Sequence, residues 1–143
     1  VVLAGHREAI ERAVALVKEH GIKRGVILPV SAPFHCVLMA PADEAMDKAL
    51  ADLPPAAMRL PLYANFTASL VSDPAEERDL LVSQVCGRVR WRESVIAMKA
   101  AGVEHFVELG GKGLGPMIGR TGEDVSIASV VTMDDIEALA EQL

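Results

Sequence analysis

The sequence has few of the residues that mark several large classes of protein. It holds only two cysteines, Cys36 and Cys86, and 3% aromatic residues in 143 positions. Two cysteines do not make the disulfide framework of a small secreted domain, so we interpret them as free thiols in a reducing compartment. Because aromatic side chains are scarce, the core must be built from Val, Leu, Ile, Met and Ala.

Basic residues and long apolar runs are also scarce. The 14 Lys and Arg residues are outnumbered by 20 Asp and Glu residues, which gives a net charge of −6. The sequence therefore lacks the basic surface that binding to a nucleic-acid backbone requires. No apolar run is long enough to cross a bilayer, and no basic signal segment opens the sequence. We expect a cytoplasmic protein whose partners include neither nucleic acid nor a membrane.

Sequence motifs for metal, phosphate and serine chemistry are missing as well. The histidines are not spaced as metal ligands, either among themselves or with the cysteines, so no metal is expected. The glycine cluster 110–115 lacks the spacing of the dinucleotide fingerprint and of the P-loop, and a tight strand-to-helix turn is the simpler interpretation. There is no Gly-x-Ser-x-Gly elbow, so the sequence lacks that form of activated serine.

What the sequence does contain is an alternation of strand-like and helix-like segments. Apolar runs predict strands at residues 1–4, 24–30, 60–64, 105–109 and 125–131. Helical spacing of apolar residues predicts helices at 6–20, 43–53, 73–85, 92–101 and 133–143. This order predicts an α/β domain with a mainly parallel sheet. The sequence opens directly on a strand-like run whose sheet partners it does not contain, so we expect it to be a fragment.

Several helix ends carry recognisable signals. Asp73 followed by Pro74 predicts a capped helix start, and Thr132 with Asp135 predicts a capping box at the last helix. Gly21 and Gly102 are placed as stops after the helices that precede them. These local signals predict helix boundaries without reference to the rest of the fold.

The segment 31–39 joins a predicted strand to a predicted helix, and its most reactive side chain is His35. Pro33 biases the residue before it away from helix, so we expect His35 on a turn, where a scaffold can present it to a cleft. An imidazole can take up a proton near neutral pH. A histidine on a loop is also common as a surface or hydrogen-bonded residue, and the adjacent Cys36 is more simply a buried thiol than a nucleophile.

Several segments resemble, in order and spacing, the C-terminal part of the malonyl-CoA:acyl carrier protein transacylases and, more broadly, the acyltransferase domains of fatty acid and polyketide synthases. They are residues 1–6, 29–39, 81–84, 89–91 and 102–110. The resemblance covers nearly the whole sequence. It implies that residues 32–143 form the C-terminal part of a large α/β-hydrolase-like acyltransferase domain. Residues 1–31 would be the second half of an inserted ferredoxin-like small domain.

The resemblance also implies an activity and a set of site residues. The family transfers a malonyl group from malonyl-CoA to the phosphopantetheine thiol of acyl carrier protein through a serine ester, without a cofactor. His35 falls on the catalytic histidine, and Gln84 falls on the residue whose main-chain carbonyl orients that imidazole. Phe34 matches a bulky position that accompanies malonyl rather than methylmalonyl selection. The glycine loop is about one residue shorter than the family's, so no role is assigned to Lys112.

The family's nucleophilic serine, oxyanion-hole residues and malonyl-binding arginine belong to the half that precedes this sequence. We therefore expect these 143 residues to be inactive alone and to need that missing N-terminal half as a partner. Two alternatives remain. One is a non-catalytic α/β interaction module that self-associates or binds carrier protein. The other is a hydrolase that uses the same histidine with water as acceptor.

Overall fold

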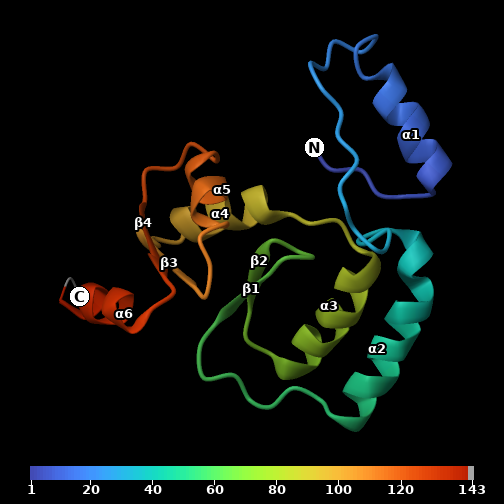
Figure 1. Ribbon diagram of the computed structural model, residues 1–143. Helices are drawn as coiled ribbons and strands as arrows, with labels where there is room; N and C mark the ends of the chain where they lie inside the picture. The colour runs from blue at the N-terminus through green and yellow to red at the C-terminus, as the bar shows by residue number, and fades with distance from the viewer. Residues whose placement is uncertain (142–143) are drawn as a thin grey trace. The chain divides into compact units, whose positions relative to one another are not determined.

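The computed structural model describes residues 1–141 and confirms the α/β class (Figure 1). The helices are α1 (Arg7–Leu16), the 3-10 turn η1 (Val37–Met39), α2 (Ala40–Asp52), α3 (Pro74–Cys86), α4 (Trp91–Ala100), α5 (Gly115–Gly119) and α6 (Met133–Ala140). The strands are β1 (Leu62–Ala64), β2 (Ser69–Val71), β3 (His105–Leu109) and β4 (Ser126–Val130). Over residues 1–141 no helix has both the length and the apolar character to span a bilayer.

The chain divides into two compact units. The first comprises Val1–Thr67 and Val71–Val89, and the second comprises Ala68–Leu70 and the chain from Arg90 onward. The boundary between residues 31 and 32 that the resemblance implies stays a prediction.

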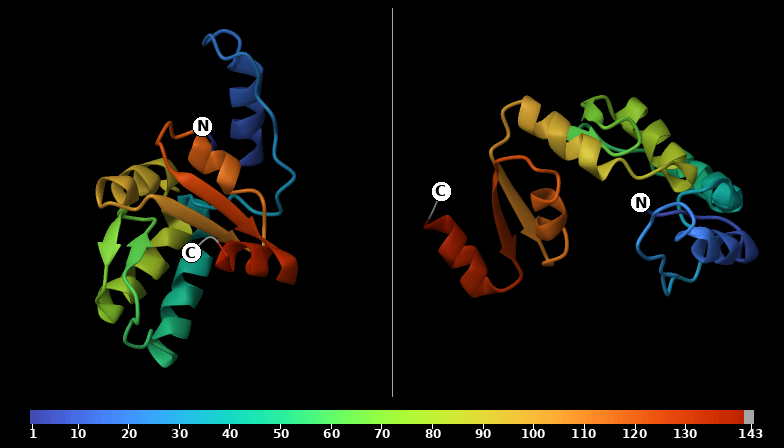
Figure 2. Two further views of the ribbon diagram at one scale, coloured as in Figure 1. Left: turned by 90° about the vertical axis from the view of Figure 1, so that its left-hand side faces the viewer. Right: turned by 90° about the horizontal axis from the view of Figure 1, so that it is seen from above.

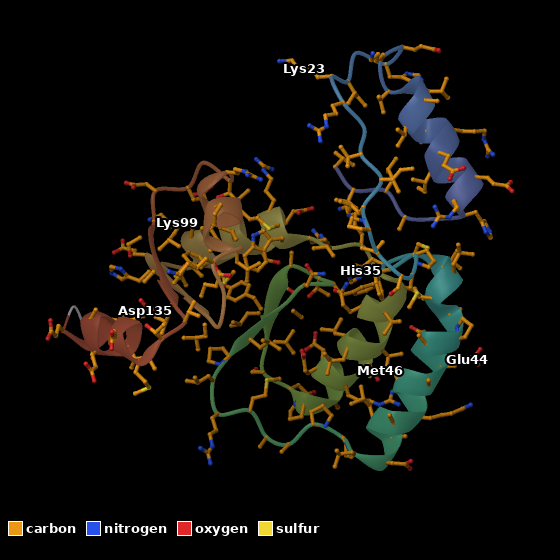
Figure 3. The ribbon with its side chains drawn as sticks, viewed as in Figure 1. Lys23, His35, Glu44, Met46, Lys99 and Asp135 are labelled. Carbon is orange, nitrogen blue, oxygen red and sulfur yellow. The ribbon has the colours of Figure 1, made fainter. Side chains whose placement is uncertain are left out.

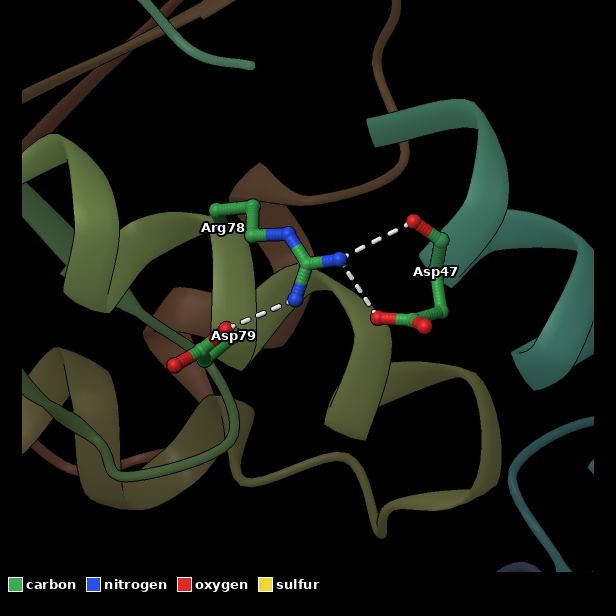
Figure 4. A network of polar contacts seen from close by, with 3 residues as sticks. All are labelled: Asp47, Arg78 and Asp79. Carbon is green, nitrogen blue, oxygen red and sulfur yellow. Dashed lines mark hydrogen bonds and ion pairs between the residues drawn. The ribbon is translucent and has the colours of Figure 1, made fainter. Parts of the chain in front are cut away.

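In the first unit, α2 packs against α3, and η1 contacts both helices. Arg78 on α3 links the two helices, because its guanidinium donates to the main-chain oxygen of Asp47 on α2 at 3.0 Å and to the Asp47 carboxylate at 2.5 Å (Figure 4). A second nitrogen of the same group donates to Asp79 at 2.9 Å. The pair lies near the surface, where an ion pair adds little to stability. It adds a polar link to the packing of α2 against α3.

The start of α3 agrees with the sequence prediction, whereas α2 starts earlier than predicted. Oδ1 of Asp73 accepts a hydrogen bond from the Ala75 amide at 2.9 Å, and Pro74 occupies the first turn. α2 begins at Ala40 rather than at residue 43 because it continues directly from η1 and carries Pro41 in its first turn, where a missing amide hydrogen costs nothing.

The predictions of strands at 1–4 and 24–30 are wrong. Both segments lack regular secondary structure, and Val26, Leu28 and Val30 are about half exposed. A strand exists only where a neighbouring strand takes its hydrogen bonds, and among residues 1–141 no segment pairs with either run. The apolar pattern indicates segments suited to burial, but it does not show whether a neighbouring strand is present to pair with them.

In the second unit, β3 and β4 run parallel, with the register from His105 opposite Ser126 to Leu109 opposite Val130 (Figure 2). α5 lies in the connection between them, and both α5 and α6 pack on β4. The parallel pairing that the alternation predicts is confirmed. Val95, Ile118 and Val130 are buried in this unit.

The ends of the helices in the second unit follow their local signals. The capping box of α6 is formed: Oγ1 of Thr132 accepts from the Asp135 amide, and Oδ2 of Asp135 accepts from the Thr132 amide. α6 ends at Ala140, and the predicted extension to residues 142–143 lies outside the described residues. Gly102 follows α4 with φ of +93°, a conformation that favours glycine.

Candidate functional site

His35 lies in the turn that precedes η1 and α2 (Figure 3). Its backbone has φ of +60°, the left-handed region that histidine enters more readily than most residues. The Sγ of Cys36 donates to the main-chain oxygen of Pro33 at 3.1 Å, which closes the turn. The predicted turn is present, and the His35 side chain on it is exposed.

The imidazole of His35 is held from one side. Its Nδ1 lies 3.2 Å from the main-chain oxygen of Gln84, in the last turn of α3 and 49 residues away in sequence. A carbonyl oxygen only accepts, so this contact is a hydrogen bond when Nδ1 carries the proton. Within the described part of the chain, Nε2 of His35 makes no hydrogen bond. In this tautomer Nε2 has a free lone pair and can act as a base.

The Gln84 side chain belongs to the same network. Its Nε2 donates to the main-chain oxygen of Gly87 at 3.1 Å and lies 3.3 Å from Nδ1 of His35. Its Oε1 accepts a hydrogen bond from Nδ2 of Asn65, which also donates to the main-chain oxygen of Arg88 at 3.3 Å. The side chain therefore touches the imidazole that its own main chain also touches.

Asn65 is the site residue that the sequence reasoning missed. It follows β1 directly, and a polar side chain just past a short apolar strand was the only signal in the sequence. Its partner Gln84 lies 19 residues further along, so no short motif connects the two.

Gly87 allows the chain to turn closely after α3. A Cβ at this position would lie 2.5 Å from the Phe66 ring and 2.8 Å from the main-chain oxygen of Ser83. Neither approach is possible for a real methyl group without displacing its neighbours. The turn that carries the acceptor for the Gln84 amide thus requires glycine.

Phe34 stands next to His35 in sequence and is 47% exposed. The structure brings His35 and Gln84 into contact, with Phe34 at the adjacent position. The roles assigned to these three residues stay predictions.

An apolar pocket lies beside Gln84 in the first unit. It is lined by Leu62, Tyr63, Ala64, Asn65, Phe66, Glu77, Leu80, Leu81 and Gln84. Glu77 is 8% exposed, and its Oε2 has no hydrogen-bond partner in the described structure. Burial, with a smaller effect from Glu76, raises the pKa of the Glu77 carboxyl above its ordinary value.

In the second unit, the glycine loop after β3 binds a side chain of its own unit. Oε1 of Glu108 accepts from the amides of Gly113 at 2.8 Å and Leu114 at 3.0 Å, and Oε2 accepts from the Gly115 amide at 2.9 Å. The Leu114 and Gly115 amides are the main cause of a lowered Glu108 pKa, with Gly113 and Ser129 adding to it. Three consecutive amides of the loop are therefore bonded within the unit, and the loop is the tight turn that the sequence predicted.

The histidine on β3 has a different environment. Nδ1 of His105 lies 2.5 Å from the Ser126 hydroxyl on the neighbouring strand β4. Among residues 1–141 no group of three or more His, Cys, Asp and Glu side chains is arranged to hold a metal ion.

Comparison with known proteins finds malonyl CoA-acyl carrier protein transacylases, although no protein family model matches the sequence. Malonyl CoA-acyl carrier protein transacylase from Escherichia coli K12 is 40% identical over 144 aligned positions, which cover the whole chain and 46% of the relative. Among solved structures, acyl-carrier-protein-S-malonyltransferase from Bartonella henselae superposes with a TM-score of 0.88 at 41% identity, over 96% of this chain and 44% of that one.

A further neighbour is a complex: a type II polyketide synthase acyl-carrier protein bound to its malonyl-transacylase. It matches with a TM-score of 0.89 at 30% identity, over 97% of this chain and 45% of that one. The chain spans less than half the length of each of these relatives.

Proposed function

Because the chain is homologous to the C-terminal part of the malonyl CoA-acyl carrier protein transacylases, we propose that it provides the histidine base for transfer of a malonyl group from malonyl-CoA to the phosphopantetheine thiol of an acyl carrier protein. The observation that carries the proposal is the 3.2 Å contact between Nδ1 of His35 and the main-chain oxygen of Gln84, with the ring exposed. That contact favours the tautomer in which Nε2 can accept a proton.

The reaction that we propose has two half-steps. A serine hydroxyl from the missing half attacks the malonyl thioester carbonyl, Nε2 of His35 takes the hydroxyl proton, and the proton then passes to the departing coenzyme A thiolate. In the second half-step the carrier thiol gives its proton to Nε2 and attacks the malonyl-serine ester, and the serine leaves with that proton. Throughout, the Gln84 carbonyl accepts from Nδ1–H and stabilises the imidazolium that forms, the role a carboxylate has in a Ser-His-Asp triad.

The proposal assigns the remaining groups to the missing N-terminal half. That half would contribute the serine, the oxyanion-hole donors and the arginine for the malonyl carboxylate, and the transfer needs no metal or cofactor. In this arrangement residues 32–143 are part of a large α/β-hydrolase-like domain, and residues 1–31 complete a ferredoxin-like small domain. The exposed apolar residues Val26, Leu28 and Val30 would then gain strand neighbours from that half.

Phe34 is proposed as a selectivity residue. An exposed ring beside the histidine would leave little room for an α-methyl group on the acyl chain. Steric discrimination of one methyl group is worth about 1–3 kcal/mol, so we expect a preference for malonyl over methylmalonyl.

Intact-mass measurement after incubation with malonyl-CoA tests the proposal. The chain alone is expected to carry no malonyl adduct, whereas a fusion with the N-terminal half of the Escherichia coli relative is expected to carry one on the serine of that half. A stable malonyl ester on any serine of this chain alone would overturn the assignment. Absence of an adduct on a folded fusion would do the same.

Exposed apolar side chains favour a second candidate function. Val1, Val2 and Leu3 are at least 66% exposed, and Val26 and Leu28 are more than half exposed. A non-catalytic module could cover such segments by pairing with a second copy or with a carrier protein. Sedimentation of the chain at low concentration tests self-association, and a well-folded monomer counts against it.

A further inference from the structure

Nδ1 of His35 contacts two groups that favour opposite protonation states of this nitrogen. The main-chain oxygen of Gln84, at 3.2 Å, accepts a hydrogen bond and favours a proton on Nδ1. Nε2 of the Gln84 side chain, at 3.3 Å, donates and favours an unprotonated Nδ1. A neutral imidazole carries one ring proton, so each tautomer satisfies only one of the two contacts.

The neighbours of Gln84 fix which end of its amide faces the ring. Oε1 accepts from Nδ2 of Asn65, and Nε2 donates to the main-chain oxygen of Gly87 at 3.1 Å. Asn65 is itself oriented, because its Nδ2 also donates to the main-chain oxygen of Arg88 at 3.3 Å. Both carbonyl oxygens can only accept, so turning either amide over would replace a hydrogen bond by a contact between two oxygens. The NH2 group of the Gln84 amide therefore faces His35.

We propose that the Asn65 and Gln84 side chains form a positioning pair that sets the tautomer of His35 against the preference of the Gln84 main chain. The main-chain oxygen holds the proton on Nδ1 and leaves Nε2 as a base. The side-chain amide stabilises the other tautomer, in which Nε2 carries the proton and cannot accept one. The resting population of His35 is divided between the two tautomers.

The catalytic meaning of this pair rests on the proposed function, since the base in that reaction is Nε2. The tautomer ratio itself is a property of the chain and needs no substrate. It would gain a role in reactivity because only the molecules with the proton on Nδ1 could accept the proton of the serine hydroxyl. A group that shifts the ratio would thus change the fraction of enzyme ready to react without touching the acyl group.

The test is NMR of the full 143-residue chain with ¹⁵N-labelled histidine, at a pH where the ring is neutral. Long-range proton–nitrogen correlations distinguish protonated from unprotonated ring nitrogens and so give the tautomer ratio of each histidine. The His35→Gln variant assigns the His35 signals, and His105, bonded to Ser126 in the second unit, is the internal reference. We compare the wild type with Gln84→Met, which keeps the main-chain oxygen and removes the amide donor.

In Gln84→Met the ratio is expected to move toward the Nδ1–H tautomer by about threefold to tenfold, the change that corresponds to losing one hydrogen bond between neutral groups. Asn65→Ala, which releases the amide without removing it, is expected to move the ratio in the same direction by a smaller factor. The His105 signals should stay unchanged in both variants, which shows that the second unit is unaffected.

An unchanged His35 ratio in Gln84→Met, or a shift toward Nε2–H, would overturn the inference. An unchanged ratio in Asn65→Ala alone would remove Asn65 from the pair. The measurement stands apart from malonyl transfer: a fusion that forms no malonyl-serine would refute the proposed function and leave the tautomer result as it is.

Discussion

The His35 turn and the glycine loop 110–115 are two irregular segments, each followed directly by a helix, and they differ in how far their polar groups are satisfied. In the glycine loop, Glu108 accepts from three consecutive amides and closes the loop on itself. In the His35 turn, only Nδ1 is engaged, and Nε2 makes no hydrogen bond within residues 1–141.

The difference separates a structural turn from a candidate reactive one. In the glycine loop, three consecutive amides are already bonded to a side chain of their own unit and are not available to a ligand, whatever the glycine content of the loop. A ring that is oriented through one nitrogen and open at the other keeps its chemistry available. We therefore propose His35, which is oriented and has an unbonded ring nitrogen within the described residues, as the candidate site in preference to the glycine loop.

The largest effect that would sharpen this contrast is expected from His35→Ala. In the fusion with the Escherichia coli N-terminal half, malonyl transfer to carrier protein should fall by about 10²–10⁴-fold, the usual worth of a positioned base. His20→Ala is the matched control, since His20 is exposed and lies outside the network. Wild-type turnover in His35→Ala would refute the role of the ring.

Next in size is the effect of Gly87→Ala on stability. The new methyl group would overlap the Phe66 ring and the Ser83 oxygen, so we expect the free energy of unfolding to fall by about 1–3 kcal/mol. Gly5→Ala is the control, because no atom lies within 4 Å of a Cβ built there. Urea unfolding of the two variants measures the difference, and equal midpoints would show that the close turn beside His35 is not required.

A smaller loss than from Gly87→Ala is expected from Glu108→Gln. The backbone amides lower the Glu108 pKa, so the carboxylate contributes stability that is present above its unfolded pKa and lost as the pH falls through the folded pKa. The variant should melt below the wild type at pH 7, and the gap should close on acidification. Thermal melts across this range test it, with the exposed Glu104→Gln as control. A gap that persists in acid would contradict the self-closed loop.

The smallest effect concerns the backbone of the His35 turn. Since φ is +60° at His35, glycine should fit the position better than alanine. We expect His35→Gly to be more stable than His35→Ala by about 0.5–1 kcal/mol in urea unfolding, although both variants lack the base. An alanine variant of equal or greater stability would show that the turn does not need the left-handed conformation.

The parts of the fold that the sequence predicted correctly are those whose causes are local. Asp73 and the Thr132–Asp135 box define helix starts through partners two or three residues away, and both are confirmed. The strand expected at 24–30 fails for the opposite reason, because strand formation depends on a neighbour that a pattern of apolar residues does not contain.

The candidate site was accessible to sequence reasoning only in part. The acid–base chemistry of His35 follows from the residue itself, but its link to Gln84 came only through the resemblance. Asn65 and Glu108 were missed because a polar residue in a sequence gives no information about its bonding partner when that partner is formed by folding. Asn65 bonds to a residue 19 positions away. The amides that bond to Glu108 converge on its carboxylate only in the folded loop, so the sequence does not show them as its partners.

The packing of α2 against α3 bears on the distance between the imidazole of His35 and the main-chain oxygen of Gln84. His35 precedes α2 and Gln84 lies near the end of α3, so the gap between ring and carbonyl measures how the two helices are spaced. Arg78, six residues before Gln84 and so about 9 Å back along α3, bonds to Asp47 on α2 and adds a polar link to the packing of the two helices. An ion pair near the surface thus joins the helix that follows the proposed base to the helix that carries its hydrogen-bond acceptor.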